Sequence, residues 1–204
     1  KTGEKVWVLP NGRLLTPAGK QVFLGAYPMG VAMHPSGKLA YVANAGKAKA
    51  VQVVDLAAGQ VVQTVTEPYI YRWLAWSPDK GRLYASGGPK SPSFRYAVDS
   101  AGKLKKDKTY AAKYGCLGLG PSADGKSLYC NVMSGALSAA DKPRPALWRL
   151  DAESGEVQNA ATLPAVPYDL AVSAGKWVYA LSWSPGTVYR VDSQLWADPQ
   201  PNDG

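Results

Sequence analysis

Histidine often serves as a general base or a metal ligand, and this chain contains a single one, His34. It lies between two predicted strands, where we expect a solvated turn side chain. With the two cysteines it cannot complete the usual three- or four-ligand zinc sets. Nothing nearby positions it for a Ser-His-Asp arrangement, and Gly-x-Ser-x-Gly, P-loop and Cys-x-x-Cys-His motifs are absent. The residues predict no catalytic group, metal or cofactor, and they favour a function other than catalysis for this chain alone.

The two cysteines, Cys116 and Cys130, lie at about equal distance from a turn predicted near Ala123, on the two strands of one hairpin. Directly opposed residues of an antiparallel pair can have Cα atoms ~4.5 Å apart, within reach of a disulfide. The pattern favours a cross-strand disulfide over two reduced, buried thiols. A disulfide would indicate an oxidising compartment, either the periplasm or the cell exterior.

Carboxylates recur at the ends of four predicted strands, at Asp55, Asp99, Asp151 and Asp192. A calcium site would need oxygen ligands at closer spacing than these show. An aspartate at a strand end, with a glycine a few residues later in the first three cases, is typical of a tight hairpin turn. We therefore expect these carboxylates to accept backbone hydrogen bonds in turns.

The elements that hold these residues belong to a repeat. Each unit has a short apolar strand, a turn rich in Pro, Ser, Asp and Gly, and a second strand centred on tyrosine; the units cover 31–44, 74–87, 119–132 and 170–182. The tyrosines recur at a spacing of roughly 45 residues, which is typical of propeller blades. A third strand then ends at the recurrent aspartate, and in the first three units a fourth strand follows.

Alternating polar and apolar residues in these segments indicate half-buried antiparallel strands, so we predict an all-β chain of four-stranded propeller blades. We assign residues 1–204 to one propeller domain or fragment, with a partial blade at 1–28, blades at 29–72, 73–116 and 117–168, and a partial blade at 169–204. The two partial blades could close a four-blade ring or end an arc of a larger propeller. We favour the arc, whose open edges would need covering.

The segments that lead into the first strand of each blade each carry a tyrosine. Such segments line one face of a propeller around its central channel, and tyrosine is a good amphipathic contact residue. The candidate binding ring is Tyr27, Tyr71, Arg72, Tyr114 and Tyr168; simple packing at the strand starts is the alternative. Most tryptophans, including Trp183, fall in predicted strands and are expected to pack between blades.

The composition limits the classes of partner that we expect. The net charge is +8, part of it in the lysine-rich run 103–108, which we expect to be a solvated loop because no interleaved aromatic residues form a stacking platform. Nucleic acid is therefore not predicted as a partner, and no apolar run reaches the ~18 residues of a membrane span. The first residue is Lys1, consistent with either a sequence that starts within a gene or a mature, processed protein.

The hairpins HPSGKLAYVAN and SADGKSLYCNV, followed in the first case by VQVVDLAAGQVVQTV, resemble the YVTN-type bacterial β-propeller repeat over essentially the whole chain. The opening LPNGRLLTPAGKQVFLG, with YPMGVAMHPSGKLAYVAN, is also similar to propellers that precede a phosphoesterase domain in some secreted bacterial proteins. The metal-binding residues of such a domain have no counterpart here.

We therefore expect a non-catalytic, extracytoplasmic propeller module for binding or scaffolding. Its partner would be a protein, a glycan or the remainder of a larger propeller, and self-association is a further option. The alternative is the propeller portion of an enzyme, such as a phosphoesterase or a periplasmic dehydrogenase subunit, with catalytic residues outside this chain.

Overall fold

The structure, a computed structural model, describes residues 7–8, 10, 12, 14–15, 19–110, 115–135, 144–174 and 176–194. In these ranges every regular element is a β-strand, so no helix there is long and apolar enough to cross a membrane. The predicted all-β class is confirmed.

The strands form four consecutive propeller blades, preceded by a short hairpin of β1 (Trp7–Val8) and β2 (Leu14–Leu15). Blade 1 contains β3 (Pro28–Met33), β4 (Leu39–Asn44), β5 (Ala50–Asp55) and β6 (Gln60–Thr66); blade 2 contains β7 (Leu74–Trp76), β8 (Arg82–Ala85), β9 (Ser93–Val98) and β10 (Leu104–Tyr110). Blade 3 contains β11 (Leu119–Pro121), β12 (Ser127–Gly135), β13 (Arg144–Asp151) and β14 (Val157–Thr162); blade 4 contains β15 (Pro167–Val172), β16 (Trp177–Ser182) and β17 (Thr187–Asp192). Neighbouring strands of each blade are antiparallel and hydrogen-bonded in chain order.

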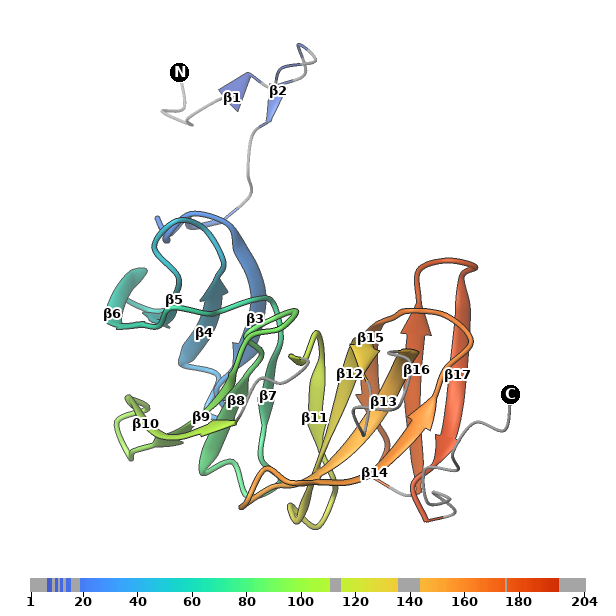
Figure 1. Cartoon of the computed structure of the whole chain (residues 1–204). Coiled ribbons are helices and arrows are strands. Elements are labelled where there is room, and N and C mark those ends of the chain that lie inside the picture. The colour runs from blue at the N-terminus through green and yellow to red at the C-terminus, as the bar shows by residue number, and fades with distance from the viewer. Residues whose placement is uncertain are drawn as a thin grey trace.

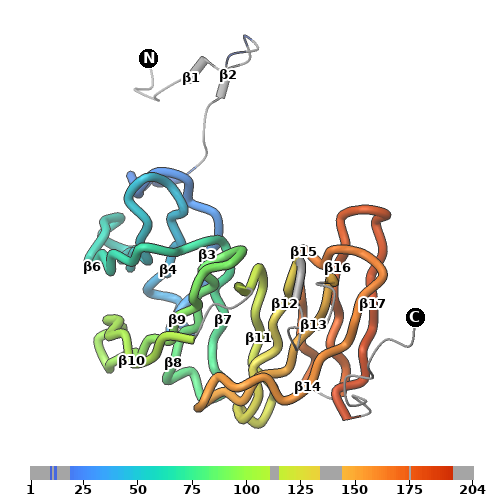
Figure 2. Tube along the Cα trace, viewed as in Figure 1, coloured from blue at the N-terminus to red at the C-terminus, as the bar shows by residue number. Residues whose placement is uncertain are grey.

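The blades follow one another along an arc, in the order of the sequence (Figures 1 and 2). The first strands β3, β7, β11 and β15 form the inner edge, where each contacts the next. We call the face with the loops between blades and between second and third strands the top face, and the opposite face the bottom face. Figure 1 shows the β16–β17 loop at the top and the β11–β12 turn at the bottom.

A hydrophobic cluster fills each space between successive blades. Between blades 1 and 2, Tyr41 and Val53 pack with Leu83 and Phe94, all almost fully buried. Similar clusters join blade 2 to blade 3 around Tyr84 and Leu119, and blade 3 to blade 4 around Leu147 and Val178. Each blade can serve two neighbours because alternate residues of a strand point to opposite faces of its sheet.

Buried tyrosine hydroxyls also connect the blades. Tyr41 Oη donates a 2.7 Å hydrogen bond to the carbonyl of Gly102, in the last turn of blade 2. Tyr110 Oη, on the outer strand β10 of blade 2, donates another 2.7 Å bond to the carbonyl of Ala152 in blade 3. Gly102 has a positive φ of 77°, which glycine adopts without the steric cost of a side chain. In the first two blades, the recurrent Tyr41 and the turn residue Gly102 therefore meet in one contact between blades.

The recurrent aspartates have the predicted turn role. Asp55 Oδ1 accepts the Ala58 N–H at 2.8 Å, and Asp99 Oδ1 accepts the Ala101 N–H at 2.9 Å. Equivalent bonds are made by Asp151 to Glu153 and Ser154, and by Asp192 to Gln194. Backbone donors hold the pKa of Asp151 below its usual value, because they stabilise the carboxylate.

The partial blade expected at 1–28 is only partly within the described residues. The only pairing among its described residues is the two-residue ladder of β1 and β2. Val22 and Leu24 instead pack over Ala40 and Val42 of blade 1, and the Gly25 N–H donates to Gln52 Oε1 at 2.8 Å. Residues 22–25 therefore cover apolar surface of blade 1, and the Gly25 N–H finds its acceptor in a side chain of that blade. The alternation of polar and apolar residues did not predict this contact.

Cys116 and Cys130 form a disulfide, with Cα atoms 5.4 Å apart. The predicted pairing is confirmed, but the predicted register is not. Cys130 is paired in the ladder with Leu119, whereas Cys116 lies before β11 begins. The disulfide therefore fastens the segment leading into blade 3 to the second strand of that blade.

Candidate functional site

The segment leading into blade 2 is held by Ser86, directly after β8. The Ser86 carbonyl accepts the Tyr71 N–H at 2.8 Å, and Ser86 Oγ accepts the Trp73 N–H at 3.0 Å. On the other side, Gly30 of β3 lies so close that a Cβ there would be 1.8 Å from the Arg72 carbonyl oxygen. These contacts fix the backbone of Arg72 at the top of the inner edge.

Arg72 extends from blade 2 to the first strand of blade 4. Its guanidinium carbon lies 3.7 Å from the centre of the Tyr168 ring, and Nη2 donates to the Tyr168 carbonyl at 3.1 Å. Nη2 also lies 3.9 Å from Asp169 Oδ2, and the guanidinium carbon is 5.7 Å from the Trp73 ring. A planar cation can stack on a ring while its edge donates hydrogen bonds, which suits arginine better than lysine.

Asp169 is the partly buried carboxylate of this site. Burial raises its pKa above the ordinary value, while the Leu170 N–H and the Arg72 charge oppose that shift. The Arg72–Asp169 ion pair is long, at 3.9 Å, and the buried Arg72 Nε–H has no acceptor among the described residues.

Trp183, in the β16–β17 loop, extends the site outward. Its side chain is 77% exposed, and its ring centre lies 5.5 Å from that of Tyr168. Tyr168 therefore contacts both a guanidinium and an indole. We call Arg72, Trp73, Tyr168 and Trp183 the aromatic–arginine cluster.

The other predicted ring residues are spread around the top face. Tyr27 is 73% exposed, and its backbone carbonyl accepts the Ala45 N–H at 2.9 Å. Tyr71 is half-buried against Gly88, where a Cβ would be 3.0 Å from the ring. Tyr114 lies outside the described residues. The structure thus brings Arg72 and Tyr168 into contact and places Tyr27 and Tyr71 beside loops of their own blades.

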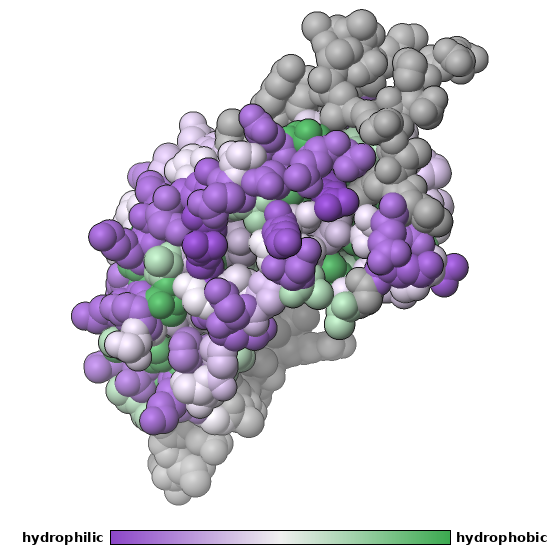
Figure 3. All heavy atoms as spheres, turned by 90° about the horizontal axis from the view of Figure 1, so that it is seen from below, coloured by the Kyte–Doolittle hydropathy of each residue, from purple (hydrophilic) through white to green (hydrophobic). Residues whose placement is uncertain are grey.

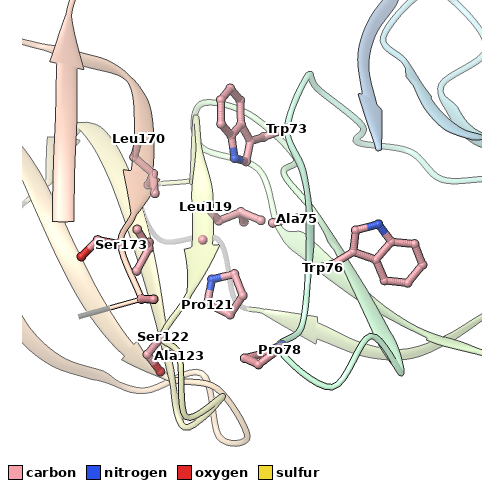
Figure 4. Close-up of a pocket in the computed structure, with 13 residues that line it drawn as sticks. Trp73, Ala75, Trp76, Pro78, Leu119, Pro121, Ser122, Ala123, Leu170 and Ser173 are labelled. Atoms are coloured by element: carbon pink, nitrogen blue, oxygen red, sulfur yellow. The ribbon is translucent and has the colours of Figure 1, made fainter. Parts of the chain in front are cut away.

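Below the cluster, the inner strands line an open groove of about 430 Å³. Figure 4 shows Trp73 near one end and Pro78, Ser122 and Ala123 near the other, with Leu119 and Leu170 between them. We call this the channel groove. Its largely aliphatic walls suit apolar side chains.

Two observations concern metal-ligating side chains and the single histidine. No group of three or more His, Cys, Asp and Glu side chains there could hold a metal ion. His34 Nδ1 lies 2.8 Å from Ser36 Oγ within the β3–β4 turn, on the bottom face. The arrangement on the top face can stack, donate hydrogen bonds and bury apolar groups, which are the abilities of a binding surface.

Sequence reasoning missed two members of this site. Trp183 was expected to pack between blades, but it lies in a loop and is largely exposed. Asp169 directly follows a predicted ring residue, yet no pattern indicated that it would approach Arg72. The Trp-Ser-Pro-Gly sequence at 183–186 was an available signal, because Pro and Gly together are typical of a turn.

The fold and this site define the chain as a β-propeller with an aromatic top face, and solved propellers resemble it. Kuenenia stuttgartiensis hydrazine synthase has a TM-score of 0.63 and 19% identity, over 86% of this chain and 48% of that chain. A putative 6-phosphogluconolactonase from Bacteroides uniformis has a TM-score of 0.63 and 17% identity, over 95% and 62%. The β-propeller domain of Myceliophteria thermophila Cps50 (Swd1) has a TM-score of 0.64 and 10% identity, over 80% and 52%.

At these identities the similarity shows the propeller fold alone. No family model and no curated protein matches the sequence. The chain spans between 48% and 62% of the length of the three solved chains named above.

Proposed function

We propose that this chain is a non-catalytic propeller module that binds a protein or glycan partner through its top face. The observation that carries the proposal is the exposure of Tyr27 on the top face of blade 1 and of Trp183 beside the Arg72–Tyr168 stack. Tyr, Trp and Arg are the residues most enriched among those that dominate binding energies. Large aromatic side chains left 73% and 77% exposed gain free energy when a partner covers them.

We also propose a repeat type and an assembly for the chain. The repeat is of the YVTN type, and residues 1–204 form one propeller domain or a segment of one, in an arc belonging to a larger ring. Exposed apolar residues on the outer blades support this arrangement. Met29, Val31 and Met33 on β3, and Leu181 and Val188 on blade 4, are all substantially exposed. Further blades or a second copy would cover them.

We also propose a periplasmic or secreted location. The Cys116–Cys130 disulfide supports it, because such bonds persist mainly in oxidising compartments. Fractionation of cells that make the protein, followed by mass spectrometry of unreduced peptides, tests this. A cytoplasmic protein with both thiols free would contradict it.

A second candidate is the propeller portion of a longer enzyme, such as a phosphoesterase or a periplasmic dehydrogenase subunit. The supporting observation is that the chain spans only 48% of a hydrazine synthase chain and 62% of a putative lactonase. The intact mass of the natural protein separates the candidates. A product much heavier than 21.7 kDa favours the enzyme, whereas phosphatase activity of this isolated chain would contradict both.

The binding proposal is tested by comparing captured proteins and glycans. The purified chain and its Tyr27→Ala/Trp183→Ala variant are immobilised and exposed to extract of the cells that make the protein. A bottom-face variant, Lys38→Ala/Lys126→Ala, is the matched control. We expect a component retained by the wild type and the control to fall about tenfold with the top-face variant, equal to ~1.4 kcal/mol. Identical capture by all three would overturn the proposal.

A further inference from the structure

Charges are divided unequally between the two faces of the propeller. Among the described residues, acidic side chains concentrate in the bottom turns: Asp55, Asp79, Asp99, Asp124, Asp151, Glu153, Glu156 and Asp192. Lysines alternate with them there, and Figure 3, drawn from below, shows a largely hydrophilic surface. The bottom face is therefore mixed in charge.

The described part of the top face is positive. Its acidic residues are Glu67, which is buried with Lys106 Nζ 2.9 Å from its carboxylate, and Asp169, which faces Arg72. Its basic residues besides Arg72 are Arg144 at the start of β13, Lys47 and Lys49 in the β4–β5 loop, and Lys90 in the β8–β9 loop. Both acidic groups are thus already matched by cations, whereas Lys47 and Lys90 extend into solvent.

These lysines lie in the loops that support the predicted ring tyrosines. The 45–49 loop is fixed to the Tyr27 segment by the Ala45 N–H to Tyr27 carbonyl bond and by the Gly46 N–H to Ala26 carbonyl bond, at 2.9 and 3.0 Å. In blade 2, Gly88 packs against the Tyr71 ring two residues before Lys90. Each of these blades therefore presents an aromatic ring and a lysine-bearing loop together on the top face.

We propose that the partner of the top face is an acidic segment of a polypeptide that carries apolar side chains between its carboxylates. This inference rests on the proposed binding function and specifies its partner. The carboxylates would lie against Lys47, Lys49 and Lys90, and the apolar side chains against Tyr27, Trp183 and the channel groove. A peptide fits better than an acidic glycan, because the groove is lined by Leu119, Leu170 and Val172, which offer few hydrogen bonds to sugar hydroxyls.

The division of charge also orients the partner. Lysines at the top attract a negative segment, and the carboxylates of Asp79 and Asp124 beyond the far end of the groove repel it. Such charges act mainly on the association rate and on specificity. Exposed charges are screened when the Debye length falls from ~10 Å at 0.1 M salt to ~3 Å at 1 M. Binding of the acidic segment must therefore weaken as salt is added.

Two fluorescein-labelled synthetic peptides serve as probes, one of repeated Glu-Leu-Ser-Glu and one of repeated Lys-Leu-Ser-Lys. Fluorescence anisotropy gives their affinities for the whole chain. We expect the acidic peptide to bind about tenfold more tightly than the basic one, with the preference lost at 1 M salt. Equal affinities, tighter binding of the basic peptide or no binding of either would overturn the inference.

Charge reversal locates the effect. Lys47→Glu/Lys90→Glu should weaken binding of the acidic peptide about tenfold, whereas Lys38→Glu/Lys126→Glu, with the same change in net charge on the bottom face, should leave it within about twofold. All four lysines lie in loops, so thermal unfolding should confirm that both variants fold. An equal effect of the two variants would show a response to net charge alone and would overturn the inference.

The inference and the proposed function fail in different ways. If Tyr27→Ala/Trp183→Ala abolishes capture of a cellular partner but Lys47→Glu/Lys90→Glu does not, the binding face stands and the acidic partner is wrong. If heparin binds the top face and the acidic peptide does not, the partner is an acidic glycan, and the inference is again overturned. If no top-face variant changes capture, the proposed function itself fails.

Discussion

Arg72 and Tyr168 are separated in the sequence by all the strands of blades 2 and 3, yet the guanidinium carbon of one lies 3.7 Å from the ring centre of the other. Their contact joins the top of blade 2 directly to the top of blade 4. It links two blades that are not neighbours along the arc, because blade 3 lies between them. The site is therefore also a structural clamp, and its variants should affect stability.

Replacement of Arg72 tests the clamp. Arg72→Ala removes the stack on Tyr168, the bond to its carbonyl and the cation facing Asp169. We expect the free energy of unfolding to fall by about 1–3 kcal/mol in urea titrations. The pKa of Asp169 should rise further above its ordinary value, because Arg72 now opposes that rise.

Arg72→Lys should recover only part of the lost stability, because an ammonium group cannot stack and donate along one plane. Lys38→Ala, in an exposed turn, is the control and should change unfolding by less than about 0.5 kcal/mol. If Arg72→Ala unfolds at the urea concentration of the wild type, the clamp does not contribute to stability.

Tyr41 should make the free energy of unfolding depend on pH in the alkaline range. Burial raises the pKa of Tyr41 from 10.0 to about 12, so the folded state keeps a proton that the unfolded chain has already released. Stability should therefore be complete below pH 10 and fall as the pH rises from 10 towards 12. Urea titrations across this range measure the effect.

Tyr41→Phe isolates this residue from the other buried tyrosines. At neutral pH it leaves the Gly102 carbonyl without its donor, and we expect a loss of about 1–2 kcal/mol. The variant and the wild type should then converge as the pH rises above the ordinary tyrosine pKa, because the phenylalanine ring of the variant has no proton to lose. A difference that stays constant with pH would contradict the assignment.

The disulfide should stabilise blade 3. Its cysteines are 14 residues apart, and a closed loop of about 15 residues is expected to contribute ~3 kcal/mol by restricting the unfolded chain. Reduction of the wild type and the double variant Cys116→Ala/Cys130→Ala should lower stability by similar amounts. Two free thiols titrated in unreduced, denatured protein would refute the bond.

Gly30 should tolerate no side chain. A Cβ at this position would lie 1.8 Å from the Arg72 carbonyl oxygen, which is backbone and cannot rotate away. Gly30→Ala should therefore separate β3 from the segment before β7 and cost about 2–3 kcal/mol. Gly81→Ala is the matched control, since its Cβ would meet nothing closer than 3.6 Å and its φ is not positive. Equal thermal unfolding of the two variants would contradict this account.

Much of the architecture could be predicted because it follows from local patterns. Alternation and the recurrent Tyr41, Tyr84, Tyr129 and Tyr179 predict the strands, and aspartates followed by glycines predict the turns. The disulfide partners were also predictable, although their register was not. The regular β11–β12 ladder pairs Leu119 with Cys130 and Pro121 with Leu128, so the hairpin is centred between residues 124 and 125 rather than at Ala123.

The candidate site was predictable only in part. The sequence placed Tyr27, Tyr71, Arg72 and Tyr168 in equivalent segments leading into blades, and it left Trp183 among the packing residues. Trp183 is exposed because it lies in the β16–β17 loop, next to Tyr168, rather than in a strand. The periodicity of the flanking strands does not predict this position.

The sequence by itself determined which segments become strands, where they turn and which loops carry lysines or carboxylates, because these properties depend on neighbours in the chain. Only the tertiary structure decided that Arg72 would meet Tyr168 and that Val22 and Leu24 would cover blade 1. Such contacts depend on the twist of each sheet and the angle between blades, which result from packing summed over whole interfaces.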